Sequence, residues 1–165
     1  TGVEVGVYKA DFTRMVADAG LKIYGVDPYR VYEDHVPGGQ HRQDFLYGHA
    51  QRALGDCPNA TLIRKTSMEA VVDFEPESLD FVYIDGNHGL RYVVEDLWEW
   101  SKRVRKGGIV AGHDWGHQAH PRIDRYCVHV SHGVLAYVRC FDIKDWYVCG
   151  GCWGDRWKSF MWIKE

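Results

Sequence analysis

Residues 79–115, LDFVYIDGNHGLRYVVEDLWEWSKRVRKGGIVAGHDW, decide the fold of this chain. The stretch opens with the apolar run Phe81–Ile84, which is long enough for a strand and too short for a helix. Runs without polar alternation are typical of strands that are buried on both faces of a parallel sheet. A polar cluster that contains a glycine, Asp85–His88, follows at the carboxyl end of this run.

A helix and a second strand complete this unit. The apolar positions that recur at helical spacing are Leu90, Val93, Val94, Leu97, Trp98 and Val104. Gly107 and Gly108 are expected to end the helix. Ile109–Ala111 is expected to form the next strand, which also ends in polar residues. Because ligands of open α/β sheets bind outside the carboxyl ends of the strands, the unit predicts chemistry at Asp85 and at His113.

Two short apolar runs upstream indicate a strand, a helix and another strand. Residues 2–7 are expected to form a strand that runs into a turn at Gly6, and residues 21–26 a strand that is closed by Asp27. Gly6 and Asp27 are 21 residues apart. In nucleotide-binding folds, about 20 residues separate the glycine turn from the acid that binds the ribose hydroxyls. No GxGxxG pattern is present, so a plain strand-to-helix turn is the alternative interpretation.

The rest of the chain continues the alternation of strands and helices. Helices are expected at 12–19, about 44–54, 67–72 and 128–141, strands at 60–64, 146–149 and 159–163, and loops at 29–43 and 116–121. Thr66 or Ser67 would cap the short third helix. The pattern predicts a doubly wound, mostly parallel seven-stranded α/β sheet with a C-terminal antiparallel hairpin.

Length and composition limit the function classes. A chain of 165 residues is expected to form one domain over residues 1–165. The formal net charge of −3, without a basic block, argues against a nucleic-acid partner. No apolar stretch approaches the ~20 residues of a membrane span. Five scattered cysteines favour reduced thiols and a cytoplasmic location, and the many aromatic residues are expected in the core or in a homodimer interface.

Four segments resemble the Rossmann-like S-adenosylmethionine-dependent methyltransferases: VEVGVYKADFT (3–13), VDPY (26–29), DFVYIDGNH (80–88) and GGIVAGHDW (107–115). More narrowly, the chain is similar to the small-molecule O-methyltransferase branch that includes macrocin O-methyltransferase and cephalosporin-hydroxylase-like proteins. It departs from the family at Ala10, where members often carry glycine. The resemblance also implies upstream helices that residues 1–165 do not include.

The resemblance implies S-adenosylmethionine as the cofactor. Glu4 and Gly6 would line its methionine end, Asp27 would bind the ribose hydroxyls, and Tyr29 would neighbour the adenine. The other residues implied to bind the cofactor are Val7, Tyr8, Pro28, Ser67, Met68, Asp85 and Gly86.

Related metal-dependent enzymes hold a divalent cation with acids at the ends of the fourth and fifth strands. The matching positions here are Asp85, His113 and Asp114. A histidine departs from the oxygen-only set that suits magnesium, and it suits manganese, iron or zinc better. The unperturbed pKa of a histidine side chain, about 6.5, suits proton removal from a hydroxyl, so His88 or His113 would otherwise serve as the catalytic base.

The function that we expect is methyl transfer from S-adenosylmethionine to a hydroxyl of a small-molecule acceptor or sugar, with help from a divalent metal. The alternatives are a nicotinamide-dependent oxidoreductase on a similar fold and a non-catalytic nucleotide-binding domain. A zinc or redox site is a weaker alternative, because the cysteine and histidine spacings match no familiar zinc motif. Its members would be Cys127, His129, His132, Cys149 and Cys152, with His113, His117 and His120.

Overall fold

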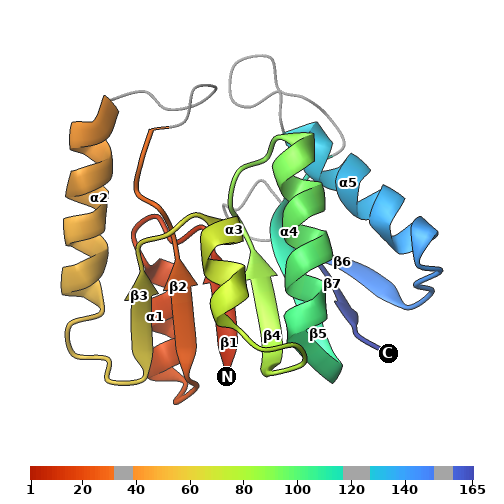
Figure 1. Cartoon of the computed structure of the whole chain (residues 1–165), viewed down its shortest axis with the longest axis horizontal. Helices are drawn as coiled ribbons and strands as arrows, with labels where there is room; N and C mark the ends of the chain where they lie inside the picture. The colour runs from red at the N-terminus through yellow and green to blue at the C-terminus, as the bar shows by residue number, and fades with distance from the viewer. Residues whose placement is uncertain (32–38, 117–126, 151–157) are drawn as a thin grey trace.

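Seven strands form one sheet in the computed structural model, which describes residues 1–31, 39–116, 127–150 and 158–165 (Figure 1). The strands are β1 (Gly2–Val5), β2 (Ile23–Val26), β3 (Ala60–Ile63), β4 (Leu79–Ile84), β5 (Val104–Trp115), β6 (Trp146–Gly150) and β7 (Lys158–Ile163). Their order is β3-β2-β1-β4-β5-β7-β6, in which β1 to β5 run parallel and β7 is antiparallel to both β5 and β6. The predicted doubly wound sheet with its C-terminal hairpin is confirmed.

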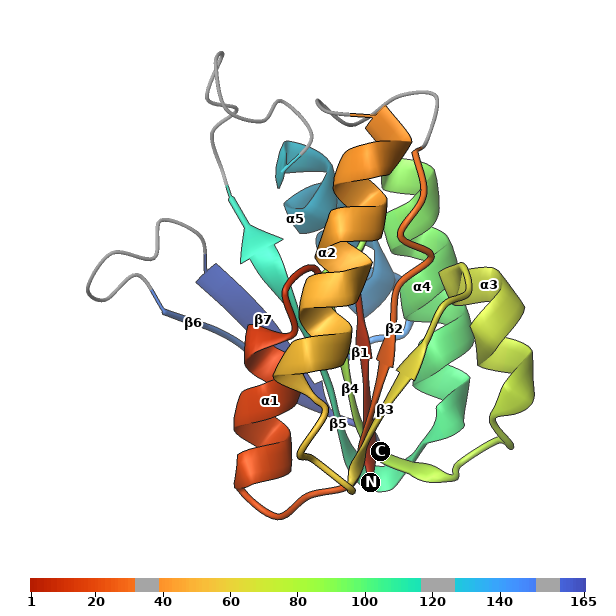
Figure 2. The same ribbon diagram turned by 90° about the vertical axis from the view of Figure 1, so that its left-hand side faces the viewer.

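Helices cover both faces of this sheet. They are α1 (Asp11–Asp18), α2 (Gly39–Ala53), α3 (Ser67–Ala70), α4 (Leu90–Arg103) and α5 (Cys127–Cys140), with a 3₁₀ turn at Val71–Asp73. Figure 2 shows the sheet nearly edge-on, with α1 on one side and α3 and α4 on the other. The largest core cluster lies between the sheet and α3, α4 and α5, around the fully buried Trp100. No helix in the described ranges is both long and apolar enough to span a bilayer.

Two predicted element boundaries were wrong. The second helix begins at Gly39 and not near residue 44, so residues 39–43 of the predicted loop are helical. The helix α4 ends at Arg103, and β5 begins at Val104 and not at Ile109. Gly107 therefore does not stop a helix. It adopts a left-handed conformation (φ 73°) inside the irregular start of β5, where the pairing with β4 shifts register.

The predicted apolar face of α4 was correct at Val93 and Leu97, which are buried, and wrong at three other positions. Leu90, Val94 and Trp98 are between 42% and 48% exposed. The buried face carries Val93, Asp96, Leu97, Trp100 and Ser101. An acid therefore lies on the inner face of this helix, among apolar side chains.

The register of the parallel strands brings four predicted residues to one edge. Val5 pairs with Val26 and with Ile84, and Ile84 pairs with Gly112. Because the strands are parallel, the residues that directly follow these positions lie side by side at the carboxyl edge. These residues are Gly6, Asp27, Asp85 and His113.

Candidate active site

The turn after β1 approaches the end of β4 closely. A Cβ atom at Gly6 would lie 2.1 Å from the carbonyl oxygen of Asp85, and Gly6 has a φ of +90°. Both the contact and the conformation exclude a side chain here. Further along the turn, Tyr8 and Ala10 also have positive φ angles, of 52° and 69°. Ala10 thus has a backbone conformation that favours glycine, the residue that family members often carry at this position.

The carboxylate of Asp27 holds this turn against the end of β2. Its Oδ2 accepts hydrogen bonds from the backbone N–H groups of Val7 (3.0 Å) and Tyr8 (3.1 Å). Its Oδ1 accepts one from the backbone N–H of Tyr29 (2.8 Å). A carboxylate offers about four acceptor positions, so three backbone bonds leave Asp27 capacity for a ligand hydroxyl. Asp27 therefore has a structural role, and the ribose role stays a prediction.

A cleft of about 730 Å³ opens above these strand ends. This volume lies within the range of small-molecule and cofactor sites. Most of the predicted cofactor residues line it: Gly6, Tyr8, Asp27, Pro28, Tyr29, Ser67, Met68, Asp85 and Gly86. The cleft also borders Asn87 and His88, and it reaches Tyr92 and Asp96 on α4.

Two predicted cofactor residues, Glu4 and Val7, are not part of the cleft lining. Val7 is buried beside Ala10 and Tyr29. Glu4 is 3% exposed and accepts a hydrogen bond from the Thr13 hydroxyl of α1. Burial raises the pKa of Glu4 to about 8, against the effect of that hydrogen bond. Glu4 is therefore largely protonated at neutral pH. Its side chain contacts α1 and does not line the cleft.

One acid of the cleft, Asp96, was not predicted from the sequence. It is 4% exposed, and its Oδ1 accepts a hydrogen bond from the Ser67 hydroxyl. Ser67 in turn accepts a hydrogen bond of 2.7 Å from Trp100 Nε1. Burial raises the pKa of Asp96 to about 7, the Ser67 hydrogen bond opposes this shift, and the charge of Glu95 adds to it. The available signal was the helical spacing of Asp96 relative to Val93 and Trp100.

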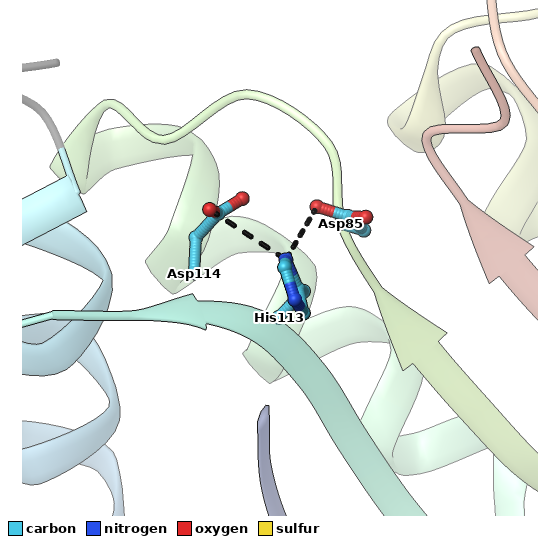
Figure 3. Close-up of side chains that lie close together, drawn as sticks. All are labelled: Asp85, His113 and Asp114. Atoms are coloured by element: carbon cyan, nitrogen blue, oxygen red, sulfur yellow. Dashed lines mark ion pairs between the residues drawn. The ribbon is translucent and has the colours of Figure 1, made fainter. Parts of the chain in front are cut away.

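A cluster of two acids and a histidine lies beside the cleft, at the ends of β4 and β5 (Figure 3). One ligand atom from each of Asp85, His113 and Asp114 can be chosen so that all three lie within 4.8 Å of one another. His113 Nδ1 is 3.6 Å from Asp114 Oδ1 and 3.9 Å from Asp85 Oδ1. The structure thus brings together the three residues that were predicted as metal ligands.

The pKa values of the two carboxyl groups of this cluster shift in opposite directions. Burial, followed by the charge of Asp114, raises the pKa of Asp85 to about 7. Burial also acts to raise the pKa of Asp114, but hydrogen bonds with His113 and His88 outweigh it and hold that pKa well below its usual range. Two carboxylates this close cannot both ionise freely without a cation or a shared proton.

The second predicted base, His88, contacts the same cluster. Its Nε2 lies 2.8 Å from Asp114 Oδ2, and its side chain lines the cleft. Asp114 adopts a left-handed conformation (φ 59°). This conformation is uncommon for residues other than glycine, although aspartate tolerates it better than most, and it is the kind of backbone strain that clusters at functional sites.

The donor set fits a divalent cation. Two carboxylates and one imidazole match the ligands of manganese, iron or zinc, and the imidazole is less suited to magnesium. The arrangement also fits metal-free base chemistry, in which a carboxylate orients a histidine. The cysteine and histidine alternative lies partly outside the described residues, since His117, His120 and Cys152 are not among them. Cys149 is exposed on the edge strand β6.

Solved structures share this fold at low sequence identity. A putative rRNA methylase from Clostridium thermocellum superposes with a TM-score of 0.69 at 14% identity, covering 99% of this chain and 88% of that one. The O-methyltransferase NovP gives a TM-score of 0.65 at 18% identity, covering 98% and 70%. The N-methyltransferase NodS from Bradyrhizobium japonicum WM9 gives a TM-score of 0.61 at 13% identity, covering 99% of this chain and 84% of that one. At these identities the likeness concerns the fold alone.

The sequence itself identifies the family. No curated protein matches the chain. A family described as a methyltransferase domain matches residues 1–115, from β1 through the end of β5. That match contains the glycine turn, Asp27, the cleft and the whole Asp85–His113–Asp114 cluster, so this chain belongs to the methyltransferase domain family.

Proposed function

We propose that this chain transfers a methyl group from S-adenosylmethionine to a hydroxyl of a small molecule or sugar. The observation that carries the proposal is the junction of two sites. The cleft that contains Asp27 and the cluster that contains Asp114 meet at Asp85 and His88. A donor in the cleft would therefore present its reactive end to the residues that can bind and deprotonate an acceptor.

The cleft has the groups that this donor requires. Asp27 retains capacity to accept from vicinal hydroxyls, and the Gly6 turn lets backbone approach a ligand. Ser67 and Met68 line the wall on which a flat base would rest. S-adenosylmethionine supplies a methyl group that its sulfonium already activates, so the protein has mainly to align the acceptor and remove its proton.

His88 is the residue that we assign to proton removal. Its Nε2 contacts Asp114, and a carboxylate in this position fixes the orientation of an imidazole and stabilises its protonated form. The side chain is 25% exposed and faces the cleft. It is thus reachable by an acceptor hydroxyl while it remains held in place.

A divalent cation would be held by Asp85, His113 and Asp114, where it would lower the pKa of the acceptor hydroxyl and orient it. Chelation is then expected to lower transfer activity, and manganese or iron(II) to restore it. Asp85→Asn should abolish the rescue while it leaves binding of S-adenosylhomocysteine within a few fold of the parent. Full activity in chelator, with His88→Gln inactive, would remove the ion from the mechanism and leave histidine as the base.

The acceptor class is tested directly by transfer of labelled methyl from S-adenosylmethionine. The panel contains phenols, sugars and an rRNA fragment, since two of the structural neighbours are described as rRNA methylases. The net charge of −3 favours a small acceptor over RNA. We expect label on hydroxyl oxygen of a small acceptor, at a rate reduced at least a hundredfold in His88→Gln and unchanged in Glu99→Gln. The control Glu99 lies on α4 and pairs with Lys102, away from the cleft lining. Label on RNA or on nitrogen would contradict the proposed acceptor.

A further inference from the structure

Asp96 is a buried acid that the proposed chemistry does not use. It lies on the inner face of α4 at 4% exposure, and it lines the cleft together with Ser67 and Met68. A buried carboxylate costs stability unless hydrogen bonds compensate it. Within the described part of the chain, the side chain that donates a hydrogen bond to it is Ser67.

The orientation of this carboxyl group is fixed from behind. Trp100, which is fully buried, donates from Nε1 to the Ser67 hydroxyl over 2.7 Å, and the Ser67 hydroxyl donates to Asp96 Oδ1. Because the tryptophan N–H donates a hydrogen bond to the Ser67 oxygen, the Ser67 hydroxyl hydrogen is directed to the acid. These two consecutive hydrogen bonds end at Oδ1 and hold the carboxyl group of Asp96 in one orientation.

The second oxygen of Asp96 lies near Gly86. Its Oδ2 lies 3.6 Å from the position that a Cβ atom on Gly86 would occupy, and Gly86 lines the cleft. An ionised carboxylate only accepts hydrogen bonds. The cleft wall between Ser67, Met68 and Gly86 thus presents a fixed acceptor to any ligand that enters.

We propose that Asp96 is a specificity-determining residue, which accepts a hydrogen bond from the exocyclic amino group of the adenine ring of the cofactor. Ser67 and Trp100 are its positioning residues. This inference rests on the proposed function, because it presumes an adenine ring against Ser67 and Met68. It adds a determinant on α4 that selects a 6-amino purine over a 6-oxo purine.

The test compares two ligands that differ at one edge of the purine. S-adenosylhomocysteine and its hypoxanthine analogue, in which a carbonyl replaces the 6-amino group and N1 carries a hydrogen, are titrated calorimetrically into the intact chain at pH 8.5. Burial, with a smaller contribution from the charge of Glu95, raises the pKa of Asp96 to about 7. Asp96 is therefore ionised at pH 8.5. A carboxylate that faces the carbonyl oxygen in place of the amino group loses a hydrogen bond and repels that oxygen. The parent chain should therefore bind S-adenosylhomocysteine at least tenfold more tightly than the hypoxanthine analogue.

The variants separate recognition from folding. Asp96→Asn can accept from an amino group and donate to a carbonyl, so its preference should fall below threefold, whereas Glu99→Gln should keep the preference of the parent. If Asp96→Asn does not fold, Ser67→Ala takes its place, and its preference should fall because the carboxyl group is no longer held. An unchanged preference in these variants would overturn the role of Asp96 and leave the proposed function intact. Failure of the parent chain to bind either ligand would overturn both.

Discussion

Replacing Glu4 by glutamine is expected to remove part of the pH dependence of the stability of this chain. Glu4 is 3% exposed on β1, and burial raises its pKa from 4.5 to about 8. Glutamine has nearly the same shape and still accepts the hydrogen bond from the Thr13 hydroxyl. The substitution therefore removes ionisation without removing the contact.

The sign of the effect follows from proton binding. Between pH 4.5 and 8 the folded chain holds a proton on Glu4 that the unfolded chain has released. The free energy of unfolding therefore falls as the pH rises through this window. The stabilisation is fully present below pH 4.5 and is lost above pH 8. One proton corresponds to about 1.4 kcal/mol per pH unit, or about 3 kcal/mol between pH 5.5 and 7.5.

Urea denaturation at pH 5.5, 6.5 and 7.5 measures this slope in the parent chain, Glu4→Gln and Glu99→Gln. The parent and the Glu99 control should share one slope, and the slope of Glu4→Gln should be shallower by about 1.4 kcal/mol per pH unit. Asp96, whose pKa is also raised to about 7, retains its own contribution in all three chains. Parallel curves for the parent and Glu4→Gln would refute the assignment of a protonated buried acid.

Two further substitutions test the turn after β1. Gly6→Ala is expected to lower the free energy of unfolding by about 3 kcal/mol or more, because its Cβ would meet the Asp85 carbonyl oxygen. Gly20→Ala, with a similar φ of +82° but no atom within 4 Å, should lose only about 1 kcal/mol, and equal losses would exclude the contact as the cause. Asp27→Ala should lower the stability of the unliganded chain by about 2 kcal/mol and weaken S-adenosylhomocysteine binding at least tenfold. Thermal melts and calorimetry measure both effects, and parent-like values in both would show that neither role is correct.

The fold and the ends of its strands were predictable because they depend on local pattern. Apolar runs that end in polar residues identify buried parallel strands, and the register then brings Asp27, Asp85 and His113 to one edge. The spacing between Gly6 and Asp27 is itself a local feature, and it predicted a nucleotide-binding turn at Gly6. The hairpin followed from two closing strands in the last 20 residues.

The errors have physical causes that a single sequence does not reveal. On α4, Val93 and Leu97 are buried as predicted. Leu90, Val94 and Trp98 are exposed, because the packing of α4 on β4 and β5 buries Asp96 and Trp100 in their place. Burial of an acid is costly and is therefore not expected from pattern alone.

Two other features of the site depend on tertiary structure. The pairing of His88 with Asp114 joins residues that are 26 positions apart in the sequence. Its geometry depends on the left-handed backbone conformation of Asp114 at the end of β5. The start of β5 was missed because a glycine pair resembles a helix stop, whereas Gly107 serves a register shift.

The proposed function requires that the cleft above Gly6, Asp27 and Asp85 binds S-adenosylmethionine. Calorimetry on the intact chain with S-adenosylhomocysteine, and separately with nicotinamide adenine dinucleotide, measures this binding. We predict one site per chain with micromolar affinity for S-adenosylhomocysteine, weakened at least tenfold in Asp27→Ala, and no measurable heat with the dinucleotide. Binding of the dinucleotide alone would contradict this claim and support the oxidoreductase alternative.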